Sequence, residues 1–305
     1  MISFRYHVVS IVAVFLALAL GVVVGTTALN GPITTNLRQQ VDSLKNDRSS
    51  LASQNQALQS KAGNSDEFAS TFAPLVVAGI LKGKRVVIMG LPGASSSIKD
   101  GIGKDIVSAG GSLVGRIQLT SDYTDPKRAN DIRSLVTTVH PIGLALPTSD
   151  DSGVLGGSLL GFVLLSTQAQ QTDTDSVLNS LLKLQMIKVE SSSVAPADLV
   201  VIVGSGTLPD KDAGGLAQLA LVTQFQSSGG HLIVAGDSPS ATGGGLVALV
   251  RADAVIKGSV ATVDDADTAM GQVAATLALA NSITGKSGAY GTGPGAGSLF
   301  PTPPK

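Results

Sequence analysis

The chain has 305 residues, a formal net charge of −1 and no cysteine. The lack of cysteine excludes disulfides, thiol nucleophiles and the cysteine ligands of zinc and iron–sulfur sites. The balanced charge and an aromatic content of 3% exclude the basic patch and the stacking surface on which nucleic-acid binding depends. We therefore expect no nucleic-acid partner.

An uncharged apolar stretch of 22 residues, Val8–Leu29, dominates the N-terminus. A helix of that length spans about 33 Å, enough to cross a hydrocarbon core of about 30 Å. Arg5 precedes the stretch and no acidic residue does, so the positive-inside rule predicts a cytoplasmic N-terminus. We therefore predict a cytoplasmic tip and transmembrane anchor over residues 1–30. The protein would then be a single-pass protein of the cell membrane and cell envelope, with the bulk of the chain extracytoplasmic.

Two other interpretations of this stretch remain open. A cleaved signal peptide has an apolar core of about 7–15 residues, shorter than this one, although Thr26–Ala28 offers a small-residue cleavage site. A buried helix of a soluble core is rarely so uniformly apolar. The length of the stretch favours the anchor, and the missing cysteine excludes a lipoprotein.

A heptad repeat follows the anchor. Leucine recurs every seven residues from Leu37 to Leu58, with Val41, Arg48 and Asn55 between the leucines. Leucine at the d position favours two parallel helices, and asparagine at an a position is typical of a device that fixes register. We predict a coiled-coil stalk over residues 31–62 and a homodimer. An amphipathic helix packed on its own domain is the alternative.

A GxxxG motif lies within the apolar stretch, formed by Gly21 and Gly25. Such a motif lets two helices in a membrane approach closely, and a dimer in the membrane agrees with a coiled coil directly after it. The predicted interface for a dimer or another partner therefore comprises Gly21, Gly25, Leu37, Val41, Leu44, Arg48, Leu51, Asn55 and Leu58.

Turn-forming residues predict where these helices end. Asn-Gly-Pro at residues 30–32 predicts the end of the membrane span, and Lys-Ala-Gly-Asn-Ser at residues 61–65 predicts the end of the stalk. Over residues 63–83 an apolar stripe predicts a linker helix, kinked by Pro74, that docks the stalk onto the next domain. The stripe consists of Phe68, Phe72, Val76 and Ile80.

From residue 84 onward, short apolar runs alternate with helical patterns. The predicted strands are Arg85–Gly90, Leu113–Leu119, Asp198–Gly204, Gly229–Gly236 and one or two short strands within Ala248–Val263. The predicted helices are Ile98–Ala109, Pro126–His140, Leu155–Gln168, Asp175–Lys188, Asp212–Ser228 and Asp267–Ile283. Strands that are apolar throughout and alternate with helices indicate a parallel sheet covered on both faces.

We therefore predict the α/β fold class, with a Rossmann-like three-layer domain and a mostly parallel sheet over residues 84–284. Residues 285–305 are rich in glycine and proline and predict a flexible tail, because they lack the apolar content to fold alone.

The loops after the predicted strands are rich in glycine and serine, and ligands of open α/β sheets bind at this edge. Gly204 and Gly206 begin a dinucleotide fingerprint, but Pro209 stands where its third glycine belongs, which favours simple tight turns. His140 and His231 do not accompany a Gly-x-Ser-x-Gly elbow. We expect no catalytic residue, no cofactor-binding residue and no enzyme.

Metal ligands are sparse in the predicted outer domain. Cu(I) prefers Cys or Met, and Cu(II) prefers His. Met89, Met186 and Met270 lie far apart in the sequence on apolar faces, which is typical of core packing. The acidic cluster at residues 264–267 lacks the spacing of a calcium loop and predicts a helix N-cap. The residues themselves assign no metal site.

Four features together resemble the actinobacterial MctB family: the opening residues 1–31, the leucine stalk, the strand at Lys84–Gly90 and the ending Ala289–Gly297. Members of that family are named copper transport proteins of the mycobacterial outer membrane. The resemblance covers essentially the whole chain and implies copper transport, efflux or tolerance; copper is implied by this resemblance alone. It carries over no catalytic or metal-binding motif.

The related SteB proteins of corynebacteria imply a different role. They are envelope proteins that act with a membrane partner, SteA, in cell division and cell-wall hydrolysis. The alternative function is therefore a non-catalytic scaffold or regulator that binds a SteA-like membrane protein or a cell-wall hydrolase.

Overall fold

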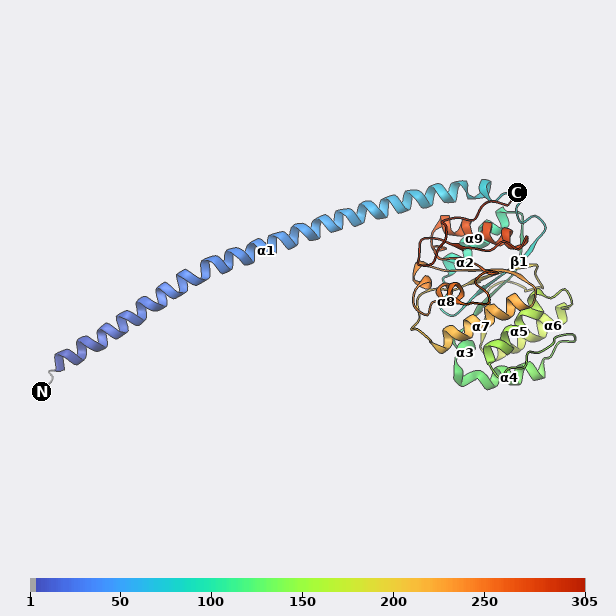
Figure 1. The fold of residues 1–305 in the computed structure, drawn as a ribbon, viewed down its shortest axis with the longest axis horizontal. Coiled ribbons are helices and arrows are strands. Elements are labelled where there is room, and N and C mark those ends of the chain that lie inside the picture. The colour runs from blue at the N-terminus through green and yellow to red at the C-terminus, as the bar shows by residue number, and fades with distance from the viewer. Residues whose placement is uncertain (1–3, 305) are drawn as a thin grey trace. The chain divides into compact units, whose positions relative to one another are not determined.

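The computed structural model describes the backbone of residues 4–304 and the side chains of residues 4–26 and 35–304. The chain divides into two compact units, Met1–Asn64 and Ser65–Lys305. The described residues of the first unit are helical, and the second unit is a sheet with helices on both faces (Figure 1).

The N-terminal helix α1 runs from Phe4 to Val76 as one helix of 73 residues. The predicted interruptions at residues 30–32 and 61–65 are therefore wrong. Glycine costs a helix about 1 kcal/mol and proline about 3 kcal/mol, local penalties that the hydrogen bonds of flanking turns outweigh. The predicted domain boundaries at residues 30 and 62 stay predictions, although α1 ends at neither. Part of the cleavage site considered at Thr26–Ala28 lies outside the described side chains.

One segment of the described chain is long and apolar enough to cross a membrane, namely Phe4–Thr26. It has 23 residues, and none of it is buried inside the protein. This fits a membrane segment by length and composition. The other apolar helix, α5 (Ser152–Leu165), is shorter and mostly buried.

Seven strands form one sheet in the order β3-β2-β1-β4-β5-β6-β7. Every neighbouring pair is parallel except β2 and β3, which are antiparallel. The strands are β1 (Arg85–Gly90), β2 (Ser112–Leu119), β3 (Ile187–Val189), β4 (Leu199–Val203), β5 (His231–Ala235), β6 (Ala261–Val263) and β7 (Ala289–Tyr290). The predicted mixed α/β class and mostly parallel sheet are confirmed. The finer assignment to a Rossmann-like domain stays a prediction.

Helices cover both faces of this sheet, because the central strands are apolar on both sides. Val86 and Ile88 of β1 point into one core layer, and Val87 and Met89 point into the other. The first layer is covered by α2, α9 and the end of α1, and the second by α4 to α8. The helices are α2 (Ser96–Ser108), α3 (Ser121–Thr124), η1 (Pro126–Arg128), α4 (Ala129–Thr138), α5, α6 (Gln171–Lys183), α7 (Ala213–Ser227), η2 (Ser238–Ala241), α8 (Leu246–Ala252) and α9 (Ala269–Ser282).

One predicted helix changes type before its end. The helix predicted over Asp175–Lys188 ends at Lys183, because Gln185 adopts a φ of 59°, and the residues after it form β3. The prediction of one or two short strands within Ala248–Val263 is confirmed by β6, although the helix α8 occupies the start of that range. A short buried apolar run has no periodicity that separates strand from helix.

The predicted flexible tail is instead packed on the domain. β7 pairs with β6, Pro301 is buried, and the Asn281 side chain donates a hydrogen bond of 2.7 Å to the Thr302 carbonyl. Backbone pairing and polar contacts hold this segment, so its low apolar content was a poor guide. Its residues Ala289–Tyr290 form the edge strand of the sheet.

Candidate functional site

The predicted interface residues all lie on α1. The four leucines of the heptad are more than half exposed, from 53% for Leu37 to 67% for Leu44, and Val41 is 59% exposed. A methyl group added to Gly21 or Gly25 would meet nothing within 4 Å. The leucine and valine side chains of the predicted heptad are therefore exposed along α1. Whether a second chain binds there stays a prediction.

The loops at the carboxyl ends of the central strands are bound to one another. The Asp237 carboxylate, after β5, accepts hydrogen bonds from the Ser205 hydroxyl at 2.6 Å and from the Gly206 amide at 2.8 Å. It also accepts one from the Ser240 amide and so caps η2. Gly206 has a φ of +71°, which glycine adopts without strain. This agrees with the interpretation of these glycines as turn formers.

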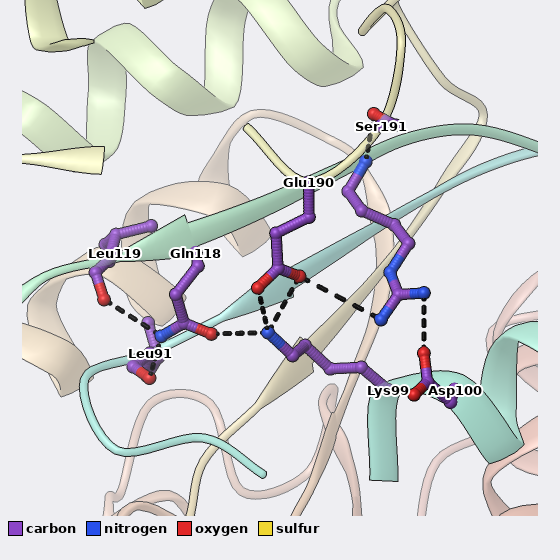
Figure 2. A network of polar contacts seen from close by, with 8 residues as sticks. Leu91, Lys99, Asp100, Gln118, Leu119, Glu190 and Ser191 are labelled. Carbon is purple, nitrogen blue, oxygen red and sulfur yellow. Dashed lines mark hydrogen bonds and ion pairs between the residues drawn. The ribbon is translucent and has the colours of Figure 1, made fainter. Parts of the chain in front are cut away.

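A buried lysine forms a polar cluster at the ends of β1 and β2 (Figure 2). Lys99 of α2 is 2% exposed, and its ammonium donates to Gln118 Oε1 at 2.6 Å and to both Glu190 oxygens at 2.7 and 2.8 Å. The Gln118 amide group donates in turn to the Leu91 carbonyl at 2.6 Å. A lysine ammonium has three hydrogen-bond donors, and the three bonds to Gln118 and Glu190 use all of them within the cluster.

Arg116 extends this cluster on β2. Its Nη1 lies 2.7 Å from the Asp100 carboxylate, and its Nη2 lies 3.9 Å from Glu190. Its Nε is buried and has no hydrogen-bond partner. The cluster joins four elements, namely the end of β1, the start of α2, β2 and the residue after β3. Its evident role is to hold the short antiparallel strand β3 in place.

A second buried ion pair lies beside the C-terminal segment. Arg251 of α8 and Asp264, after β6, are almost fully buried and 2.7 Å apart. Arg251 also donates to the Tyr290 and Pro294 carbonyls, each at 2.8 Å. Asp264 accepts from the backbone amides of Thr292 and Gly293 at 2.8 and 2.9 Å. The pair thus clamps the segment after β7 through backbone groups alone.

Two buried carboxyl groups have raised pKa values. Burial raises the pKa of Asp265 to about 6, and the neighbouring Asp264 carboxylate adds to the rise. One Asp265 oxygen, Oδ1, is buried with no hydrogen-bond partner. Burial also raises the pKa of Asp105 on α2 to about 6, against the opposing effect of Lys104. The N-cap predicted within residues 264–267 is instead Thr268, whose hydroxyl accepts from the Gly271 amide.

An apolar groove of about 390 Å³ lies on the second unit. It runs between the last turns of α1, the helix α9 and the residues around Phe300. Phe68 and Phe72 form one wall with their ring centroids 4.6 Å apart. Phe68 is 66% exposed and Leu75, nearby on α1, is 74% exposed.

The candidate copper ligands do not form a site in the described residues. Met89 and Met186 are fully buried in the same core layer, and Met270 lines the apolar groove. His140, in the loop after α4, and His231, at the start of β5, are both exposed. Within the described chain no group of three His, Cys, Asp or Glu residues could hold a metal ion.

Sequence reasoning missed both polar clusters. Lys99 and Glu190 are 91 residues apart, and Arg251 and Asp264 belong to segments whose pairing depends on the sheet order. A signal was present for one of them, because Lys99 falls among apolar residues on the inner face of its helix. The acidic cluster at residues 264–267 is visible in the sequence, but no local pattern identifies Arg251 as the partner of Asp264.

Comparison with known proteins gives the family. The family described as "Copper transport outer membrane protein, MctB" matches residues 1–301. The copper transporter MctB of Mycobacterium tuberculosis (strain ATCC 25618 / H37Rv) is 34% identical over 311 residues, which cover 98% of this chain and 99% of the relative. Copper transporter MctB of Mycobacterium leprae (strain TN) is 32% identical over 314 residues, with the same coverage. The chain belongs to the MctB family.

Proposed function

We propose that the chain is a membrane-anchored cell-envelope protein that pairs through α1 and acts in copper transport or copper tolerance. Family membership supports the copper part, since the relatives are named copper transporters. The exposed leucine register of α1 supports the pairing part. Arg5 before the apolar segment supports an orientation with the N-terminus in the cytoplasm and the outer domain outside.

The single observation that carries the pairing is the exposure of the heptad leucines. Burying one leucine side chain stabilises by about 1.5–3 kcal/mol relative to leaving it exposed. A second helix along the seam buries all four leucines at once. Two anchors in the same membrane make the helices parallel, which is the arrangement that leucine at d favours.

The same surface supports a second candidate, the role that the resemblance to SteB proteins implies. In it the chain is a non-catalytic scaffold or regulator that binds another membrane protein or a cell-wall hydrolase. A leucine seam accepts a heterologous helix as readily as a second copy. Met89 and Met186 are engaged in core packing, so the outer domain offers few free sulfur ligands of its own. In this proposal any effect on copper passes through a partner.

A non-catalytic outer domain is part of both candidates. The charged and polar groups at the carboxyl edge of the sheet serve the fold: Asp237 closes two loops, and the Lys99 cluster holds β3. Groups used in this way are poorly placed to exchange partners with a substrate.

Growth in copper tests the proposal. A strain that lacks this chain is complemented with the wild type, with Leu44→Asp/Leu51→Asp, or with the control Ser43→Asp/Ser50→Asp. The control adds the same charge at exposed c positions, outside the seam. We expect the wild type and the control to restore copper tolerance and the leucine variant to fail, because two buried aspartates per chain disrupt a leucine seam.

Capture from crosslinked native membranes separates the two candidates. If a division or cell-wall protein is captured with the wild type but not with the leucine variant, and copper tolerance is unchanged, the scaffold proposal is supported. If the strain without the chain tolerates copper as well as the wild type does, the copper proposal is wrong.

A further inference from the structure

We propose that the apolar groove beside the end of α1 is closed by a second copy of this chain, whose α1 pairs in register with the first as far as Val76. This inference rests on the proposed pairing through α1. It extends that interface beyond the predicted stalk into the outer domain.

The groove needs a cover because its walls are apolar. Every lining residue is apolar, among them Phe68, Ala69, Phe72 and Val76 of α1, Leu277 of α9 and Phe300. Phe72 is 43% exposed and Val76 50% exposed, although both side chains are large and apolar. An apolar groove with this composition is typical of a site that receives a helix.

The heptad register identifies the occupant. Counting on in sevens from Leu58 places Ser65 and then Phe72 at d, and counting on from Val41 places Ala62, Ala69 and Val76 at a. Three residues that line the groove, Ala69, Phe72 and Val76, are therefore a or d residues of the same repeat. Because α1 is one helix to Val76, the repeat has no break in which its register could change.

In a parallel, in-register pair each residue faces the residue with its own number. The Phe72 side chain of the second copy then arrives opposite Phe72 of the first. The small residues Ala62, Ser65 and Ala69 let the two backbones approach just before this point. Both grooves are closed by one two-fold contact.

Charge complementarity supports this register. In a parallel pair, a residue at g meets the residue five positions later, at e, on the other helix. Along α1 these pairs are Gln40–Lys45, Asp47–Ala52, Gln54–Gln59, Lys61–Asp66 and Phe68–Ala73. The pair nearest to the groove, Lys61 with Asp66, has opposite charges. Like charges meet in none of the five.

Cysteine crosslinking in membrane vesicles tests the inference, since the full-length chain has no cysteine of its own. Single variants Leu51→Cys, Phe72→Cys and Leu75→Cys are treated with a short bismaleimide. Glu67→Cys is the control, because position 67 is at f, exposed and turned away from the seam. Leu75 flanks the seam at g and does not line the groove, so its replacement leaves the groove intact.

We expect Phe72→Cys or Leu75→Cys to give at least about ten times more covalent dimer than Glu67→Cys, because facing residues react at the effective concentration of a joined pair. If Leu51→Cys forms a dimer while both groove variants stay at the level of the control, the groove inference is wrong and the stalk dimer stands. The groove is then open to lipid or to another protein. If Leu51→Cys also stays at the control level, the proposed pairing and the groove inference fail together.

Discussion

At the scale of single residues, the buried carboxyl group of Asp265 makes stability depend on pH. Its pKa rises from 3.8 to about 6 through burial and the neighbouring Asp264. The folded chain therefore binds more protons than the unfolded chain between these values, and its stability falls as the pH rises through that window. One pKa unit corresponds to about 1.4 kcal/mol, so ionised Asp265 costs the folded state up to about 3 kcal/mol at neutral pH.

We predict that Asp265→Asn raises the thermal midpoint of the full-length protein at pH 7.5 and reduces the difference between pH 5 and pH 7.5. Differential scanning calorimetry in detergent measures both. Asp150→Asn, on an exposed loop, is the matched control. Equal pH dependence in Asp265→Asn and the wild type would contradict the assignment, and Asp105→Asn then shows whether the other raised carboxyl group, on α2, accounts for it.

At the scale of elements, the clamp on the C-terminal segment depends on one arginine. Arg251→Met leaves the Asp264 carboxylate, which has no exposed surface, without its cation and frees the Tyr290 and Pro294 carbonyls. Removing one partner of a buried ion pair costs about 3–5 kcal/mol. We predict a loss of that order and early proteolysis after β7, measured by limited digestion and mass spectrometry.

The matched control is an exposed ion pair of the same composition. Arg85 and Asp198 lie 3.0 Å apart, with side chains 50% and 36% exposed. Arg85→Met should cost less than about 1 kcal/mol, because water screens an exposed pair. A C-terminal segment that resists protease equally in both variants would show that Arg251 is not what holds it.

Sequence patterns predicted a strand correctly where every residue of a bounded run favoured that structure. The strands β1, β4 and β5 are confirmed within two residues at each end, because each is a bounded run of β-branched and apolar residues. The failures have physical causes: β3 exists only through pairing with β2, and the C-terminal segment is held by Arg251 and by strand pairing rather than by apolar content. Long-range contacts of this kind leave no local pattern.

At the scale of the whole molecule, the alternation of strands and helices was enough to predict an α/β protein with a mostly parallel sheet. The resemblance to the MctB family is confirmed by the family match over residues 1–301. It rests on residues 1–31, the leucine stalk, the strand at Lys84–Gly90 and the ending Ala289–Gly297. The candidate site was predictable only in part. The α1 register follows from spacing alone, whereas the Lys99 cluster joins residues that the fold brings together from 91 positions apart.

The proposed function depends on the pairing of two chains through the leucine register of α1. Native mass spectrometry of the full-length protein, released from membrane nanodiscs, measures this most directly. We predict a dimer for the wild type and for Ser43→Asp/Ser50→Asp, and a monomer for Leu44→Asp/Leu51→Asp. A monomeric wild type, or a leucine variant that stays dimeric, would contradict it.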